Sequence, residues 1–244
     1  MAERSGSNNV NRFEMSGGRR AILGAILCAI MTSTASAGAE DKRIAEAKIA
    51  FDAALAMWDQ SPSPMIDLLL RRALSLHEAA GTATDRMAAR IRNRIGRNAY
   101  NGGSFVIAEQ MFRGAVRLAT PDATRTDLEF AAYLGDLAAA LREQQRYAEA
   151  WSPVCRSLAI RREAGGPNDP LVAASLNNMG RIALGEGRAG EAYALMKDAY
   201  EINLRAYGES GAAMRREAAA LDHVRQLARG IRIDIDPCGA PATS

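Results

Sequence analysis

Aromatic and β-branched side chains are scarce in this chain of 244 residues, in which Phe, Trp and Tyr together make up 5%. Alanine, leucine, arginine, glutamate and methionine dominate instead, and these residues favour helix over strand. The apolar share of 48% is large enough to bury a sizeable core. We therefore predict an all-helical protein.

The sequence also lacks an apolar run long enough for a permanent membrane anchor near its N-terminus. The run from Ala21 to Met31 falls short of the about 20 residues that a membrane-spanning helix needs. It follows Arg19-Arg20 and precedes small residues that end at Ala37, which is the order of a secretory signal peptide. We predict that residues 1–37 are cleaved after export, which makes the mature protein periplasmic or secreted.

Two questions about this N-terminus remain open. Translation from Met15 instead of Met1 would give a shorter signal of the same kind. If the signal were not cleaved, it would hold the protein at the membrane, and we expect no other membrane contact.

The mature chain has little excess charge of either sign. Residues 1–37 contain four arginines and two glutamates, so their removal lowers the net charge from +3 to +1. Nucleic-acid binding depends on neutralising many phosphates, and a nearly neutral exported chain is poorly suited to it. We expect no nucleic-acid partner.

Histidine is rare as well, and no arrangement of residues indicates catalysis. His77 and His223 are the two histidines, and neither has a spacing typical of a metal site or an activated nucleophile. The carboxylates fall on the polar faces of predicted helices, where solvated charges are expected. We therefore predict that the protein is not an enzyme and has no metal and no cofactor.

Two of the three cysteines, Cys155 and Cys238, would remain after cleavage. An oxidising compartment would permit a disulfide between them, which would close a long loop. Alternatively, Cys155 is a small buried residue and Cys238 is a free thiol in the tail. The sequence leaves both open.

The dominant pattern is an internal repeat with a period of 42. Within Thr126 to Ala206, residues recur in kind one period later, as in the pairs Leu134 and Leu176, and Ala150 and Ala192. The same period extends towards the N-terminus as far as Ser63. Such a period is the signature of stacked helical hairpins, none of which can bury its apolar face alone.

Cap residues and turns recur with this period. We predict N-caps at four positions spaced by 42, and tight turns inside three hairpins. The caps are Thr84, Thr126, Asn168 and Ser210, and the turns are 101–104, 143–146 and 185–188. The aspartates that follow the first three caps would favour the helix dipole, and Pro170 suits a first turn.

Small residues also recur where the two helices of a hairpin would cross, which allows close packing. They are Gly96, Ala138 and Gly180 on the first helices and Ala108, Ala150 and Ala192 on the second helices. Pro153 breaks the pattern, because it removes a backbone hydrogen bond from the interior of a helix. We predict a kink between Ala150 and Pro153.

The resulting layout is an α-solenoid over residues 40–229. It comprises hairpins at about 42–81, 84–120, 126–164 and 168–208, and a capping helix at 210–229 with a polar outer face. We read residues 230–244 as an extended tail that folds back on the last helices.

Three segments of the sequence resemble a known family. The segments LAIRREAGGPNDP (158–170), SLNNMG (175–180) and GRAGEA (187–192) resemble the long-form tetratricopeptide repeats of kinesin light chains. The resemblance covers about residues 42–229 and is weakest in the first hairpin, where Ile66 stands at the small-residue position. It implies a right-handed superhelix of about four hairpins whose first helices line a concave groove for an extended peptide or a partner helix.

The helical pattern predicts which residues would line this groove. On the fourth hairpin, Leu176, Met179, Gly180 and Ala183 form the buried stripe, so other residues must project from a neighbouring face. The predicted groove residues are Arg90, Asn93, Arg97, Asn101, Arg142, Asn177 and Arg181. Gly135 and Ala139 leave the middle repeat almost bare there, and we predict a shallow pocket for a bulky side chain between amide and guanidinium groups.

A structural subunit of an envelope assembly is the alternative function. Such a subunit would associate through its convex face or through an apolar docking surface on the N-terminal hairpin, at Phe51, Leu55 and Trp58. Self-association is one form of this reading. These three residues could equally be the core of the first repeat.

Overall fold

The computed structural model describes residues 38–58, 62–81, 86–120, 123–229 and 238. The predicted signal peptide, the predicted cap Thr84 and most of the predicted tail lie outside these residues.

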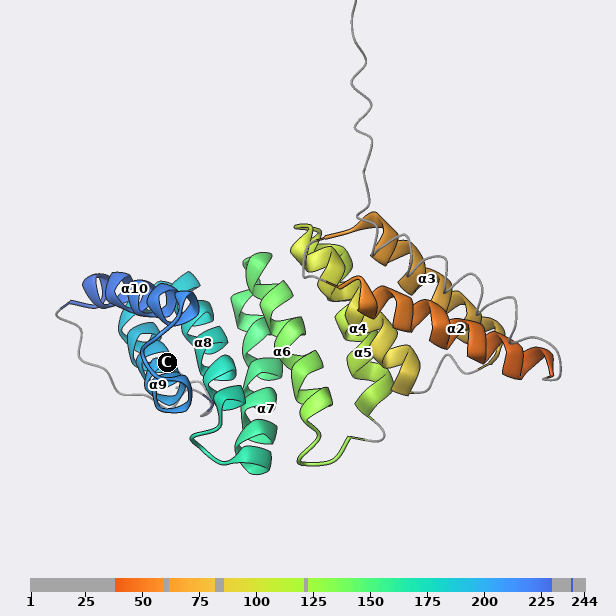
Figure 1. The fold of residues 1–244 in the computed structure, drawn as a ribbon. Coiled ribbons are helices and arrows are strands. Elements are labelled where there is room, and N and C mark those ends of the chain that lie inside the picture. The colour runs from red at the N-terminus through yellow and green to blue at the C-terminus, as the bar shows by residue number, and fades with distance from the viewer. Residues whose placement is uncertain (1–37, 59–61, 82–85, 121–122, 230–237, 239–244) are drawn as a thin grey trace, which may run out of the picture.

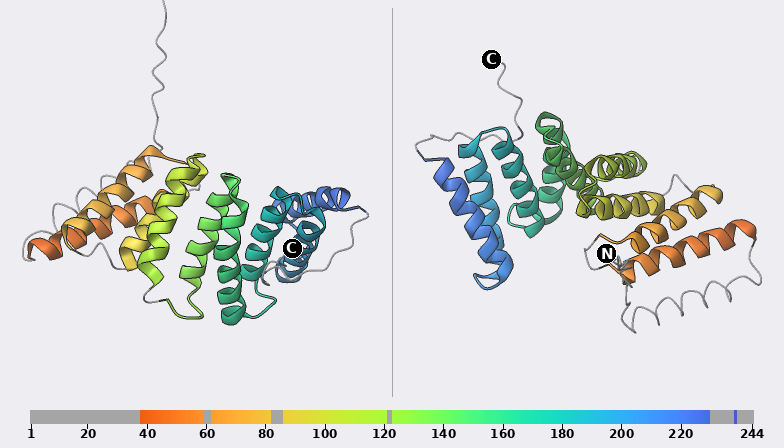
Figure 2. Two further views of the ribbon diagram at one scale, coloured as in Figure 1. Left: turned by 180° about the vertical axis from the view of Figure 1, so that it is seen from behind. Right: turned by 90° about the horizontal axis from the view of Figure 1, so that it is seen from above.

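The described residues form an all-α solenoid whose helices pack in chain order as antiparallel hairpins (Figure 1). Seen from above in Figure 2, the hairpins follow one another from the N-terminal α2 and α3 to the C-terminal α10. The helices are α2 (Ala39–Ala56), α3 (Pro64–Ala79), α4 (Arg86–Asn101), α5 (Phe105–Ala119), α6 (Leu128–Glu143), α7 (Tyr147–Gly165), α8 (Pro170–Gly185), α9 (Ala189–Tyr207) and α10 (Ala212–Leu227). None of them is long and apolar enough to cross a membrane.

The predicted period is visible in the helix boundaries. The first helices α4, α6, α8 and α10 begin at residues 86, 128, 170 and 212, and the second helices α5, α7 and α9 begin at residues 105, 147 and 189. Both series are therefore spaced by 42. In this register α10 is the first helix of a fifth repeat.

The N-caps lie one residue later than predicted. Asp127 caps α6 by accepting a hydrogen bond from the Phe130 amide at 3.0 Å, and Asp169 caps α8 by accepting one from the Leu171 amide at 2.7 Å. The prediction that Thr126, Asn168 and Ser210 are caps is wrong, because an aspartate or Gly211 occupies the cap position next to each. The carboxylate serves as both cap and dipole partner.

Asn168 instead joins the loop before α8 to α9, since its Oδ1 accepts a hydrogen bond from Arg205 at 3.1 Å. Pro170 occupies the first turn of α8 as predicted.

The turns inside the three hairpins share one backbone conformation. Residues 103, 145 and 187, again spaced by 42, have φ values of +76°, +59° and +79°. In each turn the amide of the next residue donates to a carbonyl five residues back, as Arg188 does to Ala183 at 2.8 Å. Two of these positions are glycine and the third is Gln145, which is the one non-glycine residue with positive φ in the described part of the chain.

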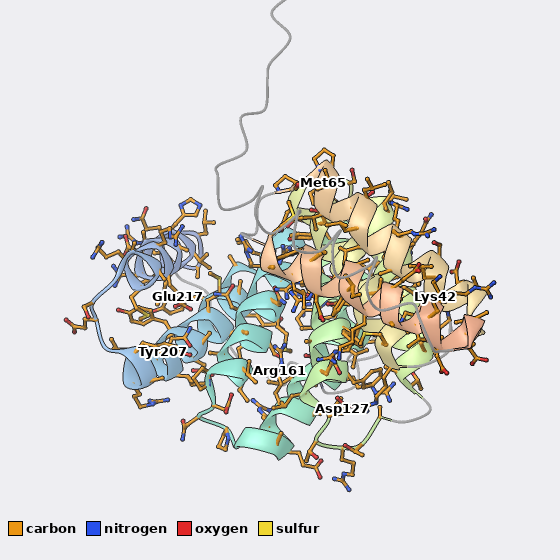
Figure 3. The ribbon with its side chains drawn as sticks, turned by 45° about the vertical axis from the view of Figure 1, so that its right-hand side comes forward. Lys42, Met65, Asp127, Arg161, Tyr207 and Glu217 are labelled. Atoms are coloured by element: carbon orange, nitrogen blue, oxygen red, sulfur yellow. A yellow bond between two sulfur atoms is a disulfide. The ribbon has the colours of Figure 1, made fainter. Side chains whose placement is uncertain are left out.

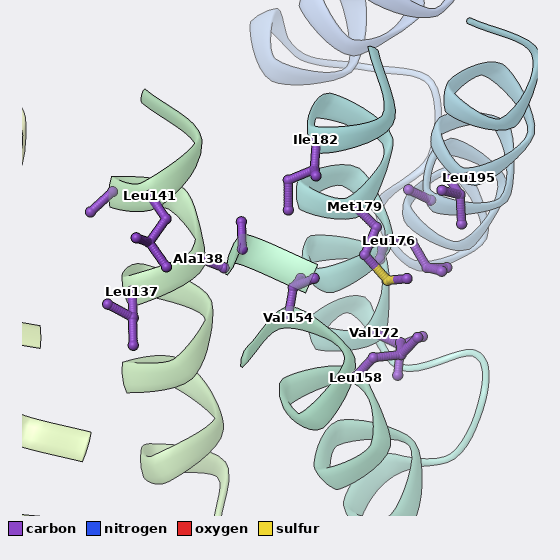
Figure 4. Close-up of a cluster of buried hydrophobic side chains, with 14 of the residues drawn as sticks. Leu137, Ala138, Leu141, Val154, Leu158, Val172, Leu176, Met179, Ile182 and Leu195 are labelled. Atoms are coloured by element: carbon purple, nitrogen blue, oxygen red, sulfur yellow. The ribbon is translucent and has the colours of Figure 1, made fainter. Parts of the chain in front are cut away.

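The core consists of clusters that extend across neighbouring hairpins. One cluster joins α6, α7, α8 and α9 through Leu141, Leu158, Met179 and Leu195, all at most 2% exposed (Figure 4). A second cluster fills the first hairpin. The stacked hairpins thus bury together the faces that a single hairpin would leave open.

Small residues allow the predicted close approach of the helices within each hairpin. A Cβ placed on Gly180 would lie 2.5 Å from Met196 Cγ and 3.1 Å from the Ala192 carbonyl oxygen. A Cβ on Gly96 would lie 2.6 Å from the ring of Phe112. Larger side chains at these positions would force the helices apart.

Helix α7 continues through Pro153, which lies inside it. The kink stays a prediction.

The N-terminal hairpin uses its apolar residues for its own core. Phe51 is 5% exposed and packs in the cluster of the first hairpin, while Leu55 and Trp58 are half-buried against the same cluster. The Arg94 guanidinium lies 5.5 Å from the centre of the Trp58 ring. Core packing therefore accounts for these residues, and no docking surface is needed to explain them.

An arginine in the turn between α6 and α7 fastens neighbouring hairpins. Arg146 Nη1 contacts both carboxylate oxygens of the buried Glu109 on α5 at 2.8 Å, and its other nitrogens bind Glu149. In the next repeat Arg188 has the same register, but it lies over the ring of Trp151 at 4.7 Å. The arginine thus recurs at this position, but its partner on the preceding hairpin changes from a carboxylate to an aromatic ring.

Candidate interaction face

The candidate site is the exposed surface of the first helices α4, α6 and α8, which we call the first-helix face. It is defined by Arg90 and Arg97 on α4, Glu129, Asp136 and Glu143 on α6, and Asn177 and Arg181 on α8. Helix α6 packs directly against both α4 and α8, so these side chains belong to one continuous surface.

The arginines that α4 contributes are paired with acids of α6. Arg90 Nε lies 2.8 Å from Glu129, and Arg97 Nε lies 3.8 Å from Asp136. Both ion pairs are substantially exposed, and the arginines are about half exposed. This half of the first-helix face is therefore neutralised from within the protein.

Asn93 is buried rather than part of the surface. It is 6% exposed, and its Nδ2 donates to Asp136 Oδ2 at 2.9 Å. Its amide thus helps to hold α6 against α4. The structure places it behind the first-helix face, where it cannot reach a partner directly.

Asp136 lies at the centre of a positively charged surrounding. Burial raises its pKa, while Arg97, the Asn93 amide, Arg161 and Arg94 act in the opposite direction. Three arginines therefore oppose the effect of burial on this one carboxylate.

Arg161 reaches this region from α7 and is 8% exposed (Figure 3). Its Nη1 donates to the Leu171 carbonyl at 3.1 Å and to Ser175 Oγ at 2.9 Å. Burial lowers its pKa, and the charges of Asp136 and Asp169 oppose that shift. Arg161 therefore connects α7 with the start of α8 at the joint between two repeats.

The predicted pocket beside Gly135 is not formed. A Cβ on Gly135 would lie 3.6 Å from Ser157 Oγ and 3.7 Å from Arg161 Nη2, which is ordinary packing contact. Gly135 itself is buried. The prediction of a recess for a bulky side chain is wrong, because side chains of α7 occupy the space that the missing side chain leaves.

Arg142 belongs to an internal network that crosses three repeats. Its Nη2 donates to Tyr100 Oη on α4 at 3.0 Å, its Nη1 donates to Asn178 Oδ1 on α8 at 3.3 Å, and it pairs with Glu143. Tyr100 also donates to Glu143 Oε1 at 3.1 Å. Arg142 is 7% exposed, so it supports the first-helix face and does not present a free guanidinium as expected.

The charges of this network follow from its geometry. Partial burial raises the pKa of the Tyr100 hydroxyl, so the group remains protonated and can donate. Partial burial would also raise the pKa of Glu143, but the hydrogen bond and the charge of Arg142 outweigh it and lower that pKa. Glu143 is therefore held as a carboxylate between Tyr100 and Arg142.

Two predicted residues on α8 are not engaged. Asn177 is half-buried and Arg181 is exposed, and neither makes a hydrogen bond or an ion pair within the part of the chain that the structure describes. The positive charge of Arg181 acts on Tyr100 and Glu143, which places it beside the network. Asn101, at the end of α4, is also exposed.

The sequence-based selection missed the acids of α6. Glu129 follows Arg90 at the same interval in the sequence at which Asp136 follows Arg97. This constant spacing of opposite charges was a readable signal, because first helices of successive repeats lie side by side. Tyr100 was missed because nothing in its local pattern separates it from a packing residue.

Cys155 and Cys238 are joined by a disulfide, with their Cα atoms 5.7 Å apart. Cys155 is half-buried on α7 and Cys238 is exposed. The bond closes a loop of 83 residues that contains α8, α9 and α10.

Comparisons with known proteins agree with this architecture. Residues 128–205 match the family model of the tetratricopeptide repeat. The fold is similar to a crystal structure of nearly identical TPR-like repeats of a candidate kinesin light chain from Podosopora anserina, with a TM-score of 0.59 and 15% identity, over 78% of this chain and 87% of that chain. No curated protein matches the chain in sequence.

A second crystal structure, BtubC (BKLC) from P. vanneervenii, has a TM-score of 0.52 and 15% identity, over 85% of this chain and 99% of that chain. At such identities the likeness establishes the fold alone.

The fold and the first-helix face define a helical repeat protein of the solenoid class. Residues 128–205 carry tetratricopeptide repeats, which generally act as protein–protein interaction modules.

Proposed function

We propose that this protein is exported and binds an extended peptide or a helix of a protein partner along its first-helix face. The observation that carries the proposal is the unpaired state of Asn177 and Arg181 on α8 among the described residues, next to a face whose other arginines are satisfied internally. A half-buried amide and an exposed guanidinium, both without partners among the described residues, are able to recognise a ligand.

The arrangement supports a division of roles. Asn177 can donate to and accept from a peptide backbone, and Arg181 can hold a carboxylate through two parallel hydrogen bonds. The network of Tyr100, Arg142, Glu143 and Asn178 joins α4, α6 and α8, so these groups are presented on a rigid surface. Arg90 and Arg97 would contribute only after exchanging their acidic partners.

Export is supported by the N-terminal sequence and is compatible with the disulfide. Residues 19–37 have the order of a secretory signal. Disulfides persist in oxidising compartments, which include the periplasm and the extracellular space.

The double substitution Asn177→Ala/Arg181→Ala tests the proposal. A photo-crosslinking residue at Ala174, an exposed position on α8, would be introduced into the exported protein in its own cells, with and without the double substitution. We expect a crosslinked partner that is lost or reduced at least about tenfold in the double variant, with the melting temperature unchanged.

The matched control is Lys197→Ala/Glu201→Ala, which removes an exposed ion pair on α9 and should leave the crosslink intact. A partner retained by the double variant would contradict binding through Asn177 and Arg181. If the partner contacts the second helices or the N-terminal hairpin instead, the alternative function, a structural subunit of an envelope assembly, would be favoured.

A further inference from the structure

Among the described residues, the last helix packs mainly on one neighbour, α9, whereas α8 packs on α6, α7 and α9. α10 buries Met214 and Val224, whereas α8, which has the same length and the same register, buries eight residues. Asn203 on α9 adds hydrogen bonds to both carboxylate oxygens of Glu217 at 3.1 Å. An isolated helix of this length is marginal in water, so α10 depends on these contacts and on any tether that keeps it near α9.

Polar residues on the outer side of α10 prevent a further helix from covering it. Asp222 stands one repeat after Gly180, at the position where a small residue would accept the second helix of a hairpin. It pairs with Arg225 at 2.6 Å and accepts a hydrogen bond from Gln226 at 3.1 Å on the same helix. The outer side of α10 is thus closed to packing, and α9 is left as its main support.

The disulfide is placed to supply the missing restraint. Cys238 follows α10 in the chain, and Cys155 lies on α7, before the hairpin of α8 and α9 on which α10 packs. In the neighbouring repeats the position of Cys155 is held by Arg113 and Lys197, which form ion pairs within their own surroundings. Here the cysteine ties the end of the chain to the preceding repeat instead.

We propose that the Cys155–Cys238 disulfide is a redox-sensitive clasp that keeps α10 docked on α9. A dithiol reductant would open it by thiolate attack on the exposed Cys238 sulfur, which breaks the Cys155–Cys238 bond and releases Cys155 as a thiol. The second thiol of the reductant then displaces Cys238, so two electrons pass from the dithiol, which leaves as a disulfide, to the two cysteines. Reduction raises the entropy available to the undocked segment, and α10 opens while the earlier repeats stay folded.

Hydrogen–deuterium exchange on the full chain tests this clasp. A Cys28→Ser background removes the third cysteine, and the oxidised protein is compared with protein treated with dithiothreitol and with Cys238→Ser. We expect amides of α10 to exchange at least about tenfold faster in the reduced protein and in Cys238→Ser, with α4 to α7 unchanged. Cys238→Ser should show no further response to dithiothreitol.

Three outcomes would overturn the proposal. They are the absence of a peptide crosslinked through Cys155 and Cys238 in the oxidised protein, an α10 that exchanges equally fast with and without reductant, and an equal acceleration in every helix. The last would show that the bond stabilises the whole solenoid and does not act selectively on α10.

Discussion

At the scale of single residues, the recurring turn shows how strictly the backbone restricts one position. Residues 103, 145 and 187 have positive φ, and glycine occupies the first and the third. A left-handed conformation costs an ordinary residue about 1 to 2 kcal/mol, because its Cβ crowds the backbone. Gln145 bears that cost, and the contacts of Gln144 and Arg146 with Glu109 on either side keep the turn in place.

Gln145→Gly should therefore stabilise the protein. Relief of the left-handed strain exceeds the extra entropy that glycine gives the unfolded chain, and we expect a gain of about 0.5 to 1 kcal/mol in the free energy of unfolding. Chemical denaturation followed by circular dichroism measures it. Gln145→Ala keeps the strain and should give no gain, and a loss of stability in the glycine variant would contradict this explanation.

At the scale of the elements, polar networks fix how neighbouring helices sit against one another. The network of Tyr100, Arg142, Glu143 and Asn178 takes members from α4, α6 and α8. Its stability depends on the charge of Glu143, whose pKa is lowered from the ordinary value of 4.5. A carboxyl group with a lowered pKa stabilises the folded state above its unfolded pKa, and this contribution is lost as the pH falls through the folded pKa.

Glu143→Gln should accordingly lower the stability by about 1 kcal/mol at neutral pH, because the ion pair with Arg142 is replaced by a hydrogen bond to an uncharged amide. The difference in melting temperature between the native protein and this variant should narrow as the pH falls from about 7 to about 3. Asp136 titrates in both proteins, so its raised pKa cancels in the difference.

Asn178→Ala is the matched comparison, because it breaks a contact of the same Arg142 with an amide that does not titrate. Its difference from the native protein should stay nearly constant over this range. A Glu143→Gln difference that is equally constant would show that the carboxylate does not carry the pH dependence.

At the scale of the whole molecule, the protein is a stack in which each hairpin is stabilised mainly by its neighbours. The two ends of such a stack need covers of their own. At the C-terminal end, α10 places Val224 and Leu221 in the cluster of Ala192 and Met196, and it turns charged residues outward. Leu227, near the end of α10, is 50% exposed.

A chain truncated after Gly208 should therefore associate. Loss of α10 uncovers the apolar surface of α9, and we expect concentration-dependent light scattering with most of the helical content retained. In full-length Cys155→Ser, α10 opens more often but can dock again on α9, so this variant should scatter less than the truncated chain. A truncated chain that stays monomeric at the same concentrations would show that α10 is not the cover.

The sequence by itself determined the fold class, the repeat period and the close helix crossings, because these depend on local propensity and on the recurrence of residue size. At two single positions, Gly96 and Gly180, the sequence predicted that helices pack closely. It predicted the N-caps one residue early, because a threonine or asparagine beside an aspartate offers the same local signal and the exact start of the helix decides between them.

Only the tertiary structure decided which polar residues remain available for binding. Asn93 and Asn177 occupy equivalent positions, yet Asp136 of the next helix engages Asn93, while Asn177 has no such partner among the described residues. Arg142 and the space beside Gly135 are likewise taken up by groups far away in the chain. A side chain's place on a helix follows from its own periodicity, but its free or paired state depends on neighbours that packing brings into contact.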